Sequence, residues 1–257
     1  MSKSTRWTEE QLLVAFALYC RIPFGLFHQH NPEIIRYAEL IGRTPSALAM
    51  KLSNIASLDP VFIESGRKGL EGASQADQKM WDSMQADWEG FALRSQAALD
   101  NLGATDLEPQ EQDSTAPDFS AEDAVVRRKQ RIGQNLFRQA VLSAYDHRCC
   151  ISGLAVPQFL IASHIVPWSQ DKQNRLNPHN GLALCALHDK AFDLGYLTLD
   201  EDYRVVISPA LTSQHKDDHF TQDSLLRFHG QRILLPGKFA PAQDLLECHR
   251  NEVFISK

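Results

Sequence analysis

The sequence predicts an α+β protein with an all-α, helix-turn-helix-like N-terminal domain and a C-terminal domain that mixes short strands with helices. Helix start and stop signals follow one another through the first hundred residues. An acidic stretch poor in aliphatic residues then separates the two halves. Beyond it, the apolar pattern becomes strand-like and then helical again. We therefore expect domains at 1–99 and 120–257, joined by an acidic flexible linker at 100–119.

Size and composition agree with two domains. The chain has 257 residues, 43% of them hydrophobic, and domains usually contain about 100 to 150 residues. No apolar run approaches the roughly 20 residues that span a bilayer, and no secretory segment begins the chain, so we expect a cytoplasmic protein. The five cysteines form an odd, unevenly spaced set, which favours reduced thiols over a disulfide framework.

The net charge of −6 is unevenly distributed along the chain. Formal charges are +2 for residues 1–69, −11 for 70–126 and +3 for 127–257. The acidity therefore belongs to the middle of the chain, and either flanking part can bind a polyanion. A basic cluster opens the second part and comprises Arg127, Arg128, Lys129 and Arg131.

Helix signals are strongest in the N-terminal part. Thr8 and Gln11 form a capping-box pattern that predicts a helix over about 9–20. Apolar residues at helical spacing predict another over about 75–98. Between them, two further helices are separated by a tight turn at Gly42, and each begins with a capping residue followed by proline.

This pair, starting at Asn31-Pro32 and Thr44-Pro45, has the form of a helix-turn-helix. In DNA-binding proteins the second helix of such a pair exposes polar side chains to the major groove. A helical hairpin that packs its own core remains the alternative interpretation. The candidate nucleic-acid-binding residues on the second helix are Ser46, Lys51, Ser53 and Asn54.

The C-terminal part begins with a predicted helix from about Ser120 to Tyr145. An extended apolar stretch follows, contains His164 and ends at Pro167. After a polar loop, the segment 180–195 reads as a short strand and then a short helix closed by Gly195. The predicted order is strand, loop, strand, helix.

The remaining sequence predicts supporting elements. The segment 196–208 has the pattern of a hairpin with its turn at Glu201-Asp202. A closing helix is expected after Pro241. We expect these elements to support the preceding strands and helix.

The segment ASHIVPW…RLNPHNGLALCALHDKAFDLG resembles the ββα-metal finger of HNH endonucleases, with a core over about 148–200. His164, Asn180 and the pair His188-Asp189 stand at the three landmark positions. The segments NPEIIRYAELIG and RTPSALAMKLSNIASLDP also resemble an N-terminal module of bacterial, restriction-type HNH proteins. The resemblance implies metal-dependent hydrolysis of DNA that leaves a 3′-hydroxyl and a 5′-phosphate.

The residue types agree with this chemistry. A neutral imidazole can accept a proton from water at physiological pH, which makes His164 the candidate general base. Asp189 and Asp193 are four residues apart and can share one cation on one helix face, with His188 as a further ligand. Carboxylates favour Mg²⁺ or Mn²⁺. As the resemblance implies, Asn180 braces the loop or orients His164.

Two features depart from the family pattern. Ser163 precedes the base, where many HNH enzymes place a metal-binding Asp or His, so the cation depends on the helix. Cys150 and Cys185 are each half of the CxxC pairs that some HNH enzymes use to bind zinc. A zinc site of Cys150, Cys185, His188 and a fourth ligand is less favoured than buried free thiols. Arg175 and Lys190 are candidate phosphate contacts, although such side chains are often only solvated.

We therefore predict a DNA endonuclease acting on double-stranded DNA, in restriction or phage defence, with modified DNA as one candidate substrate. The biological setting rests on analogy alone. Two alternatives remain: a non-catalytic DNA-binding regulator that lost its chemistry through Ser163, and an RNA-cleaving toxin nuclease. A homodimer is compatible with the sequence.

Overall fold

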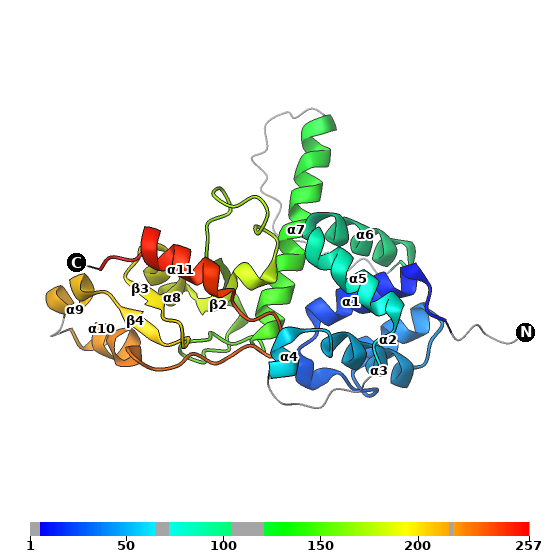
Figure 1. Cartoon of the computed structure of the whole chain (residues 1–257), viewed down its shortest axis with the longest axis horizontal. Coiled ribbons are helices and arrows are strands. Elements are labelled where there is room, and N and C mark those ends of the chain that lie inside the picture. Colours follow the sequence, from blue (N-terminus) through cyan, green and yellow to red (C-terminus); the bar gives the residue numbers. More distant parts are fainter. Residues whose placement is uncertain (1–5, 65–71, 104–120, 216–217, 257) are drawn as a thin grey trace, which may run out of the picture. The chain divides into compact units, whose positions relative to one another are not determined.

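The computed structural model describes residues 6–64, 72–103, 121–215 and 218–256 (Figure 1). The chain divides into two compact units, Met1–Leu136 and Phe137–Lys257. The expected linker lies, from residue 104 onward, outside the described residues. Among the described helices, none is long and apolar enough to cross a membrane.

The first unit is built around α1 (Glu9–Arg21). The capping box is present as predicted: Thr8 Oγ1 accepts from Gln11 N at 3.2 Å, and Gln11 Oε1 accepts from Thr8 N at 3.2 Å. Every residue from Leu12 to Cys20 is buried, so α1 is a central helix. Helices α3, α5 and α6 contact it. The surrounding helices are α2 (Pro32–Leu40), α3 (Pro45–Ala56), α4 (Pro60–Glu64), α5 (Gln75–Ala86) and α6 (Trp88–Asn101).

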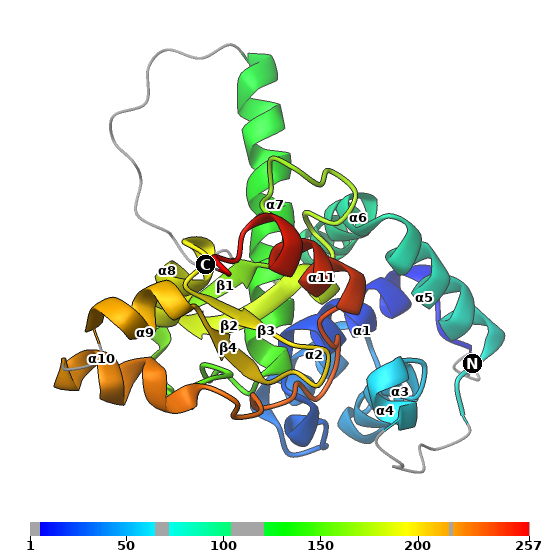
Figure 2. The same cartoon turned by 60° about the vertical axis from the view of Figure 1, so that its left-hand side comes forward.

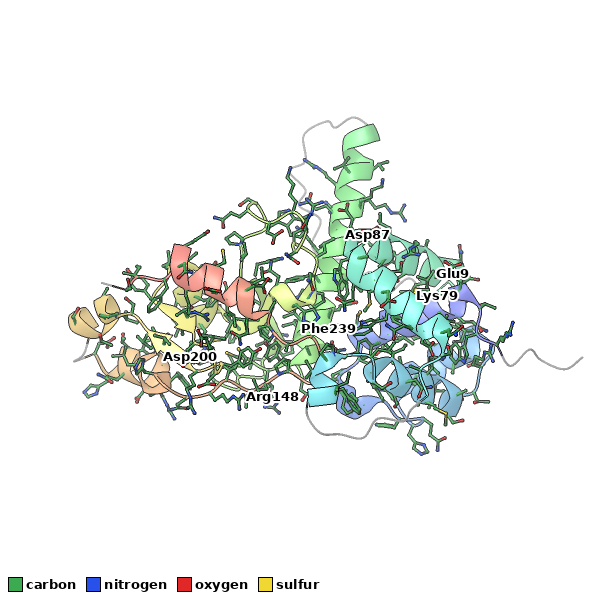
Figure 3. The ribbon with its side chains drawn as sticks, viewed as in Figure 1. Glu9, Lys79, Asp87, Arg148, Asp200 and Phe239 are labelled. Carbon is green, nitrogen blue, oxygen red and sulfur yellow. The ribbon has the colours of Figure 1, made fainter. Side chains whose placement is uncertain are left out.

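The structure has two helices where the sequence predicts one over 75–98. The break is at Asp87, which ends α5 and begins α6 (Figure 3). Its side chain accepts a hydrogen bond from Gly90 N at 2.8 Å and so caps α6. A capping carboxylate inside an amphipathic pattern therefore interrupts the helix without interrupting the apolar periodicity.

The two predicted helices and the turn between them are present as α2 and α3. Asn31 caps α2 by accepting from Glu33 N at 2.8 Å, and Thr44 caps α3 by accepting from Ala47 N at 3.2 Å. Gly42 has a φ of +67°, which allows the tight turn between them. Local sequence signals were sufficient to predict both helices because each helix begins with its own capping residue.

The second unit contains the predicted strand–loop–strand–helix order. Strands β1 (Leu160–His164) and β2 (Gly181–Cys185) form an antiparallel ribbon in which His164 pairs with Gly181. Helix α8 (Ala186–Asp193) follows directly and contacts both strands (Figure 2). The ribbon and helix together form a ββα unit.

Further elements complete the second unit. The predicted hairpin is β3 (Leu197–Leu199) with β4 (Val205–Ile207), and Glu201-Asp202 lie in its turn. Helices α8 and α11 both contact β3. Helix α7 (Ala121–Ala144) belongs to the second unit from Phe137 onward. The other helices are α9 (Pro209–His215), α10 (His219–Ser224) and α11 (Gln243–Glu252), with short 3₁₀ turns at Pro157–Phe159, Pro178–Asn180 and Leu226–Phe228.

Close packing against the end of α7 fixes the ribbon. At Gly181 a Cβ atom would overlap Val141 Cγ2 and lie 3.1 Å from Phe137 Cζ. Only glycine leaves room for the helix at this point. Gly181 pairs with His164, so this contact also sets the depth at which the histidine lies.

Candidate active site

His164 is held between two aromatic rings. It is the last residue of β1, and its ring stacks on Phe137 with centroids 4.1 Å apart and an interplanar angle of 6°. Trp168 meets the same imidazole edge-on at 5.7 Å. These contacts restrict rotation of the ring and leave it half-buried.

A backbone carbonyl sets the tautomer of His164. Nε2 lies 2.9 Å from Arg175 O. Because a carbonyl oxygen can only accept, Nε2 carries the proton and Nδ1 keeps its lone pair. Within the described residues, no hydrogen bond occupies Nδ1. Burial lowers the pKa of His164, partly opposed by the bond to Arg175, so the neutral ring predominates at neutral pH.

Asn180 braces the loop that follows His164. It is fully buried, and Oδ1 accepts from Val166 N at 2.8 Å. Its Nδ2 donates to Val166 O at 3.0 Å and to Asn174 O at 3.3 Å. The amide therefore binds both polar backbone groups of Val166, two residues beyond His164, and is not hydrogen-bonded to the imidazole. Of the two roles expected for Asn180, the geometry favours the brace.

Two carboxylates lie on α8. Asp189 is half-buried in the first turn, and Asp193 is exposed at the last position. Partial desolvation and then the charge of Asp189 raise the pKa of Asp193, while Lys190 opposes the shift. The two carboxylates offer oxygen atoms, the ligand type that hard divalent cations prefer. Helix α8 packs against β1, the strand that carries His164.

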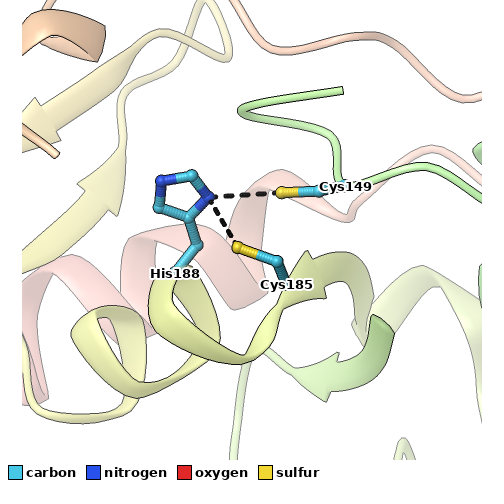
Figure 4. Close-up of side chains that lie close together, drawn as sticks. All are labelled: Cys149, Cys185 and His188. Atoms are coloured by element: carbon cyan, nitrogen blue, oxygen red, sulfur yellow. Dashed lines mark hydrogen bonds between the residues drawn. The ribbon is translucent and has the colours of Figure 1, made fainter. Parts of the chain in front are cut away.

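His188 belongs to a different cluster from these carboxylates. Its ring is buried, and Nδ1 lies 3.3 Å from both Cys149 Sγ and Cys185 Sγ (Figure 4). Nε2 lies 2.9 Å from Ser224 O. With both nitrogens occupied in this way, His188 is not placed to complete a cation site with Asp189 and Asp193, contrary to our expectation.

Cys149 and Cys185 shift each other's pKa in opposite directions. A hydrogen bond from Cys185 lowers the pKa of Cys149, and burial opposes that shift. The same contact with Cys149 raises the pKa of Cys185. The cluster uses Cys149, whereas the sequence had pointed to Cys150. Cys150 is buried outside this group.

Comparison with known families matches residues 149–200 to the HNH endonuclease family. Residues 149–200 are an HNH endonuclease domain. Among solved structures, the chain is similar to one described as "Modification dependent TagI restriction endonuclease", with 21% identity and a TM-score of 0.32. The similarity covers 46% of this chain and 37% of that chain. A search of curated proteins gave no significant match.

Ser163, the residue directly before His164 on β1, is buried. The side chain is 3% exposed, and Oγ has no hydrogen-bond partner among the described residues. Neighbouring residues of a strand point to opposite faces, so Ser163 and His164 leave β1 in opposite directions. Ser163 thus presents a neutral hydroxyl on the face of β1 opposite to His164.

The expected nucleic-acid contacts have different environments. Lys190 and Ser46 are exposed and Asn54 is half-buried. The guanidinium of Arg175 lies 5.1 Å from the centre of the Trp168 ring. Lys51 is 6% exposed, and its Nζ is 2.8 Å from Asp77 Oδ1. A lysine held in this buried ion pair is not available to DNA, so the structure does not support Lys51 as a contact.

Three site contributions were missed from the sequence. The backbone oxygen of Arg175 has no sequence signal because any residue supplies one. The ring of Phe137 stacks on His164, a contact that its place in a predicted helix does not indicate. Cys149 has a signal: it stands three residues before Ser152, as Cys185 stands three before His188.

Proposed function

We propose that the chain is a divalent-cation-dependent endonuclease that hydrolyses DNA phosphodiester bonds with His164 as general base. The hydrogen bond from His164 Nε2 to Arg175 O, 2.9 Å long and inside an HNH domain, supports this role for His164. That bond leaves the lone pair at Nδ1, where a water can deliver its proton. The lowered pKa keeps this lone pair available at neutral pH.

The side chains of the ββα unit have separate roles in the proposed reaction. His164 Nδ1 removes the proton from the attacking water, and Arg175 O stabilises the resulting imidazolium through the Nε2–H group. Asn180 keeps the loop after β1 in place through Val166. A divalent cation held by Asp189 and Asp193 would neutralise charge on the scissile phosphate and the leaving oxygen.

Oxygen ligands favour Mg²⁺ or Mn²⁺ at this site. Asp189 and Asp193 offer only oxygen, and Ser163 points to the face of β1 opposite His164. Such a small protein ligand set leaves several coordination positions to water and substrate, as is usual for magnesium in phosphoryl-transfer sites. We therefore expect millimolar rather than micromolar cation requirements.

We further propose double-stranded DNA as the substrate and restriction or phage defence as the setting, with modified DNA as one candidate target. The α2–α3 pair supports this proposal because two short capped helices joined by a tight turn are the parts that a helix-turn-helix requires. Ser46 and Asn54 on α3, together with Lys190 and Arg175 near the ββα unit, remain proposed nucleic-acid contacts. Cleavage of modified against unmodified phage genomes tests the setting.

The central experiment incubates plasmid DNA with the full chain and Mg²⁺, Mn²⁺ or EDTA. We expect cation-dependent nicking or cutting that EDTA abolishes and that His164→Ala reduces by about 10²- to 10⁴-fold. His219→Ala is the matched control because His219 is exposed on α10. Cutting that persists in EDTA, or that survives in folded His164→Ala, contradicts the proposal.

The buried hydroxyl of Ser163 favours one second candidate, a DNA-binding regulator without catalysis. Replacing a charged ligand by a neutral one weakens cation binding, which an HNH domain used only for binding would tolerate. DNA-binding and cleavage assays on the wild-type chain, run in parallel, separate the two functions. An enzyme should cut DNA when Mg²⁺ is added, whereas a regulator should bind DNA with no cutting.

A further inference from the structure

We propose that Cys149, Cys185 and His188 bind a Zn²⁺ ion, at a site distinct from the proposed catalytic cation. Their ligand atoms Sγ, Sγ and Nδ1 all lie within 4.8 Å of one another (Figure 4). All three residues are buried. Thiolate and imidazole are the ligands that zinc prefers in structural sites, whereas magnesium requires oxygen.

The spacing of the atoms fits a tetrahedral ion. Zn–S bonds of about 2.3 Å and Zn–N bonds of about 2.0 to 2.1 Å place sulfur and nitrogen about 3.6 Å apart around one tetrahedral zinc. Both sulfur–nitrogen distances here are 3.3 Å. Shifts of a few tenths of an ångström therefore suffice to admit the ion.

The proton arrangement on His188 also favours a cation. Nε2 carries the proton because it donates to Ser224 O at 2.9 Å. Nδ1 therefore has a single lone pair, yet two sulfurs lie at the same distance from it. One lone pair cannot serve two thiols well, whereas a cation among the three atoms satisfies all of them. Histidines that bind metals commonly donate their second nitrogen to a backbone carbonyl in this way.

Backbone structure brings the three ligands together. The turn containing Cys149 is closed by Cys149 N donating to Leu154 O at 2.9 Å, and Cys150 N donates to Ala183 O at 2.7 Å, which ties the turn to β2. Cys185 ends β2 and is the N-cap of α8, so it presents its thiol beside His188. We assign the fourth coordination position to water.

The ion would act as a structural cross-link in the HNH domain. It joins the turn before β1 to the junction of β2 and α8 and, through Ser224, to the end of α10. His188 directly precedes Asp189, so zinc would also hold the start of the helix that carries the two carboxylates. Binding a metal only in the folded state stabilises that state.

The experiment measures zinc in the untagged full chain after dialysis. We expect about one Zn²⁺ per chain, at least a tenfold lower content in Cys149→Ser and Cys185→Ser, and no change in Cys248→Ser. Cys150→Ser separates the neighbouring thiol from Cys149 and should keep its zinc. Equal zinc in Cys149→Ser and wild type, or no zinc uptake by the folded wild type, overturns the proposal.

A second measurement avoids variants that fail to fold. The wild-type chain is stripped with a chelator and titrated with Co²⁺ alone. Thiolate coordination should produce a strong near-ultraviolet charge-transfer band that added Zn²⁺ abolishes and Mg²⁺ does not. A folded chain that takes up Co²⁺ without this band contradicts thiolate ligation. Neither measurement depends on DNA cleavage, so the zinc proposal can be tested even if the nuclease proposal fails.

Discussion

His164 and His188 are the same chemical group placed in two different environments. In each, Nε2 lies 2.9 Å from a backbone carbonyl, that of Arg175 or that of Ser224. Both rings therefore present Nδ1 as the unprotonated nitrogen. Nδ1 of His188 lies 3.3 Å from two sulfurs, whereas Nδ1 of His164 has no hydrogen bond within the described residues.

In both sites a backbone carbonyl fixes which ring nitrogen carries the proton. The atoms around Nδ1 then decide whether that nitrogen binds a metal or accepts a proton. Soft sulfur atoms around a lone pair favour metal binding. An unoccupied lone pair on a half-buried ring favours proton transfer. Either use requires a neutral imidazole, which explains why the same backbone device serves both sites.

Replacing His164 and replacing His188 should affect different properties of the protein: the cleavage rate in one case, and zinc content and stability in the other. His164→Ala should lower the single-turnover cleavage rate by about 10²- to 10⁴-fold while leaving zinc content unchanged. His188→Ala should remove zinc and lower the midpoint of thermal unfolding. Parallel cleavage, metal analysis and unfolding experiments check this. Zinc loss in His164→Ala would show that the two sites are not independent.

A third imidazole, that of His249, differs from that of His164 because both of its nitrogens are hydrogen-bonded. Nδ1 lies 2.9 Å from Thr198 Oγ1 and Nε2 lies 3.1 Å from Phe192 O. Burial lowers its pKa to about 4. Because the unfolded chain binds this proton near pH 6.5, the free energy of unfolding should fall by about 3 kcal/mol as pH drops from above 6.5 to about 4.

Denaturant unfolding of His249→Gln and wild type at several pH values tests this. The variant should lose most of that acid dependence, although its stability at neutral pH is also reduced. His219→Gln, at an exposed position, should keep the wild-type dependence. If the free energy of unfolding of His249→Gln changed with pH as steeply as that of the wild type, other groups would be responsible for the acid sensitivity.

Asn180→Ala should give an intermediate effect by removing the brace beside His164. The change leaves the buried N–H and C=O of Val166 without their side-chain partner, which costs about 1 to 3 kcal/mol. Cleavage should decrease as the loop loses its position. Unfolding and cleavage measured together check the link, and an unstable variant with full activity would separate the loop from catalysis.

The smallest expected effect concerns the pH profile of cleavage. Cleavage should decline at acidic pH as Nδ1 of His164 becomes protonated, with the midpoint below the usual histidine value because burial lowers the pKa. Phe137→Leu removes the stacked ring and lets water approach. Its acidic limb should shift to higher pH. A shift to lower pH would show that the ring does not act through desolvation.

Local signals predicted the helical elements well because each depends on neighbouring residues. The caps at Thr8, Asn31 and Thr44 and the positive-φ glycine at Gly42 act within one turn of chain. The split at Asp87 was missed because the apolar spacing continues through it. The same limit applies to Lys51, whose burial depends on Asp77, a residue 26 positions away.

The ββα order, the HNH resemblance and the places of His164, Asn180, Asp189 and Asp193 along these elements could be read from the amino-acid sequence, since they follow from spacing along the chain. The environment of each histidine could not, because it depends on tertiary contacts. Arg175 O, Phe137 and Cys149 reach their histidines across 11, 27 and 39 positions. Such contacts depend on how the turn, ribbon and helices pack, which local residue patterns do not encode.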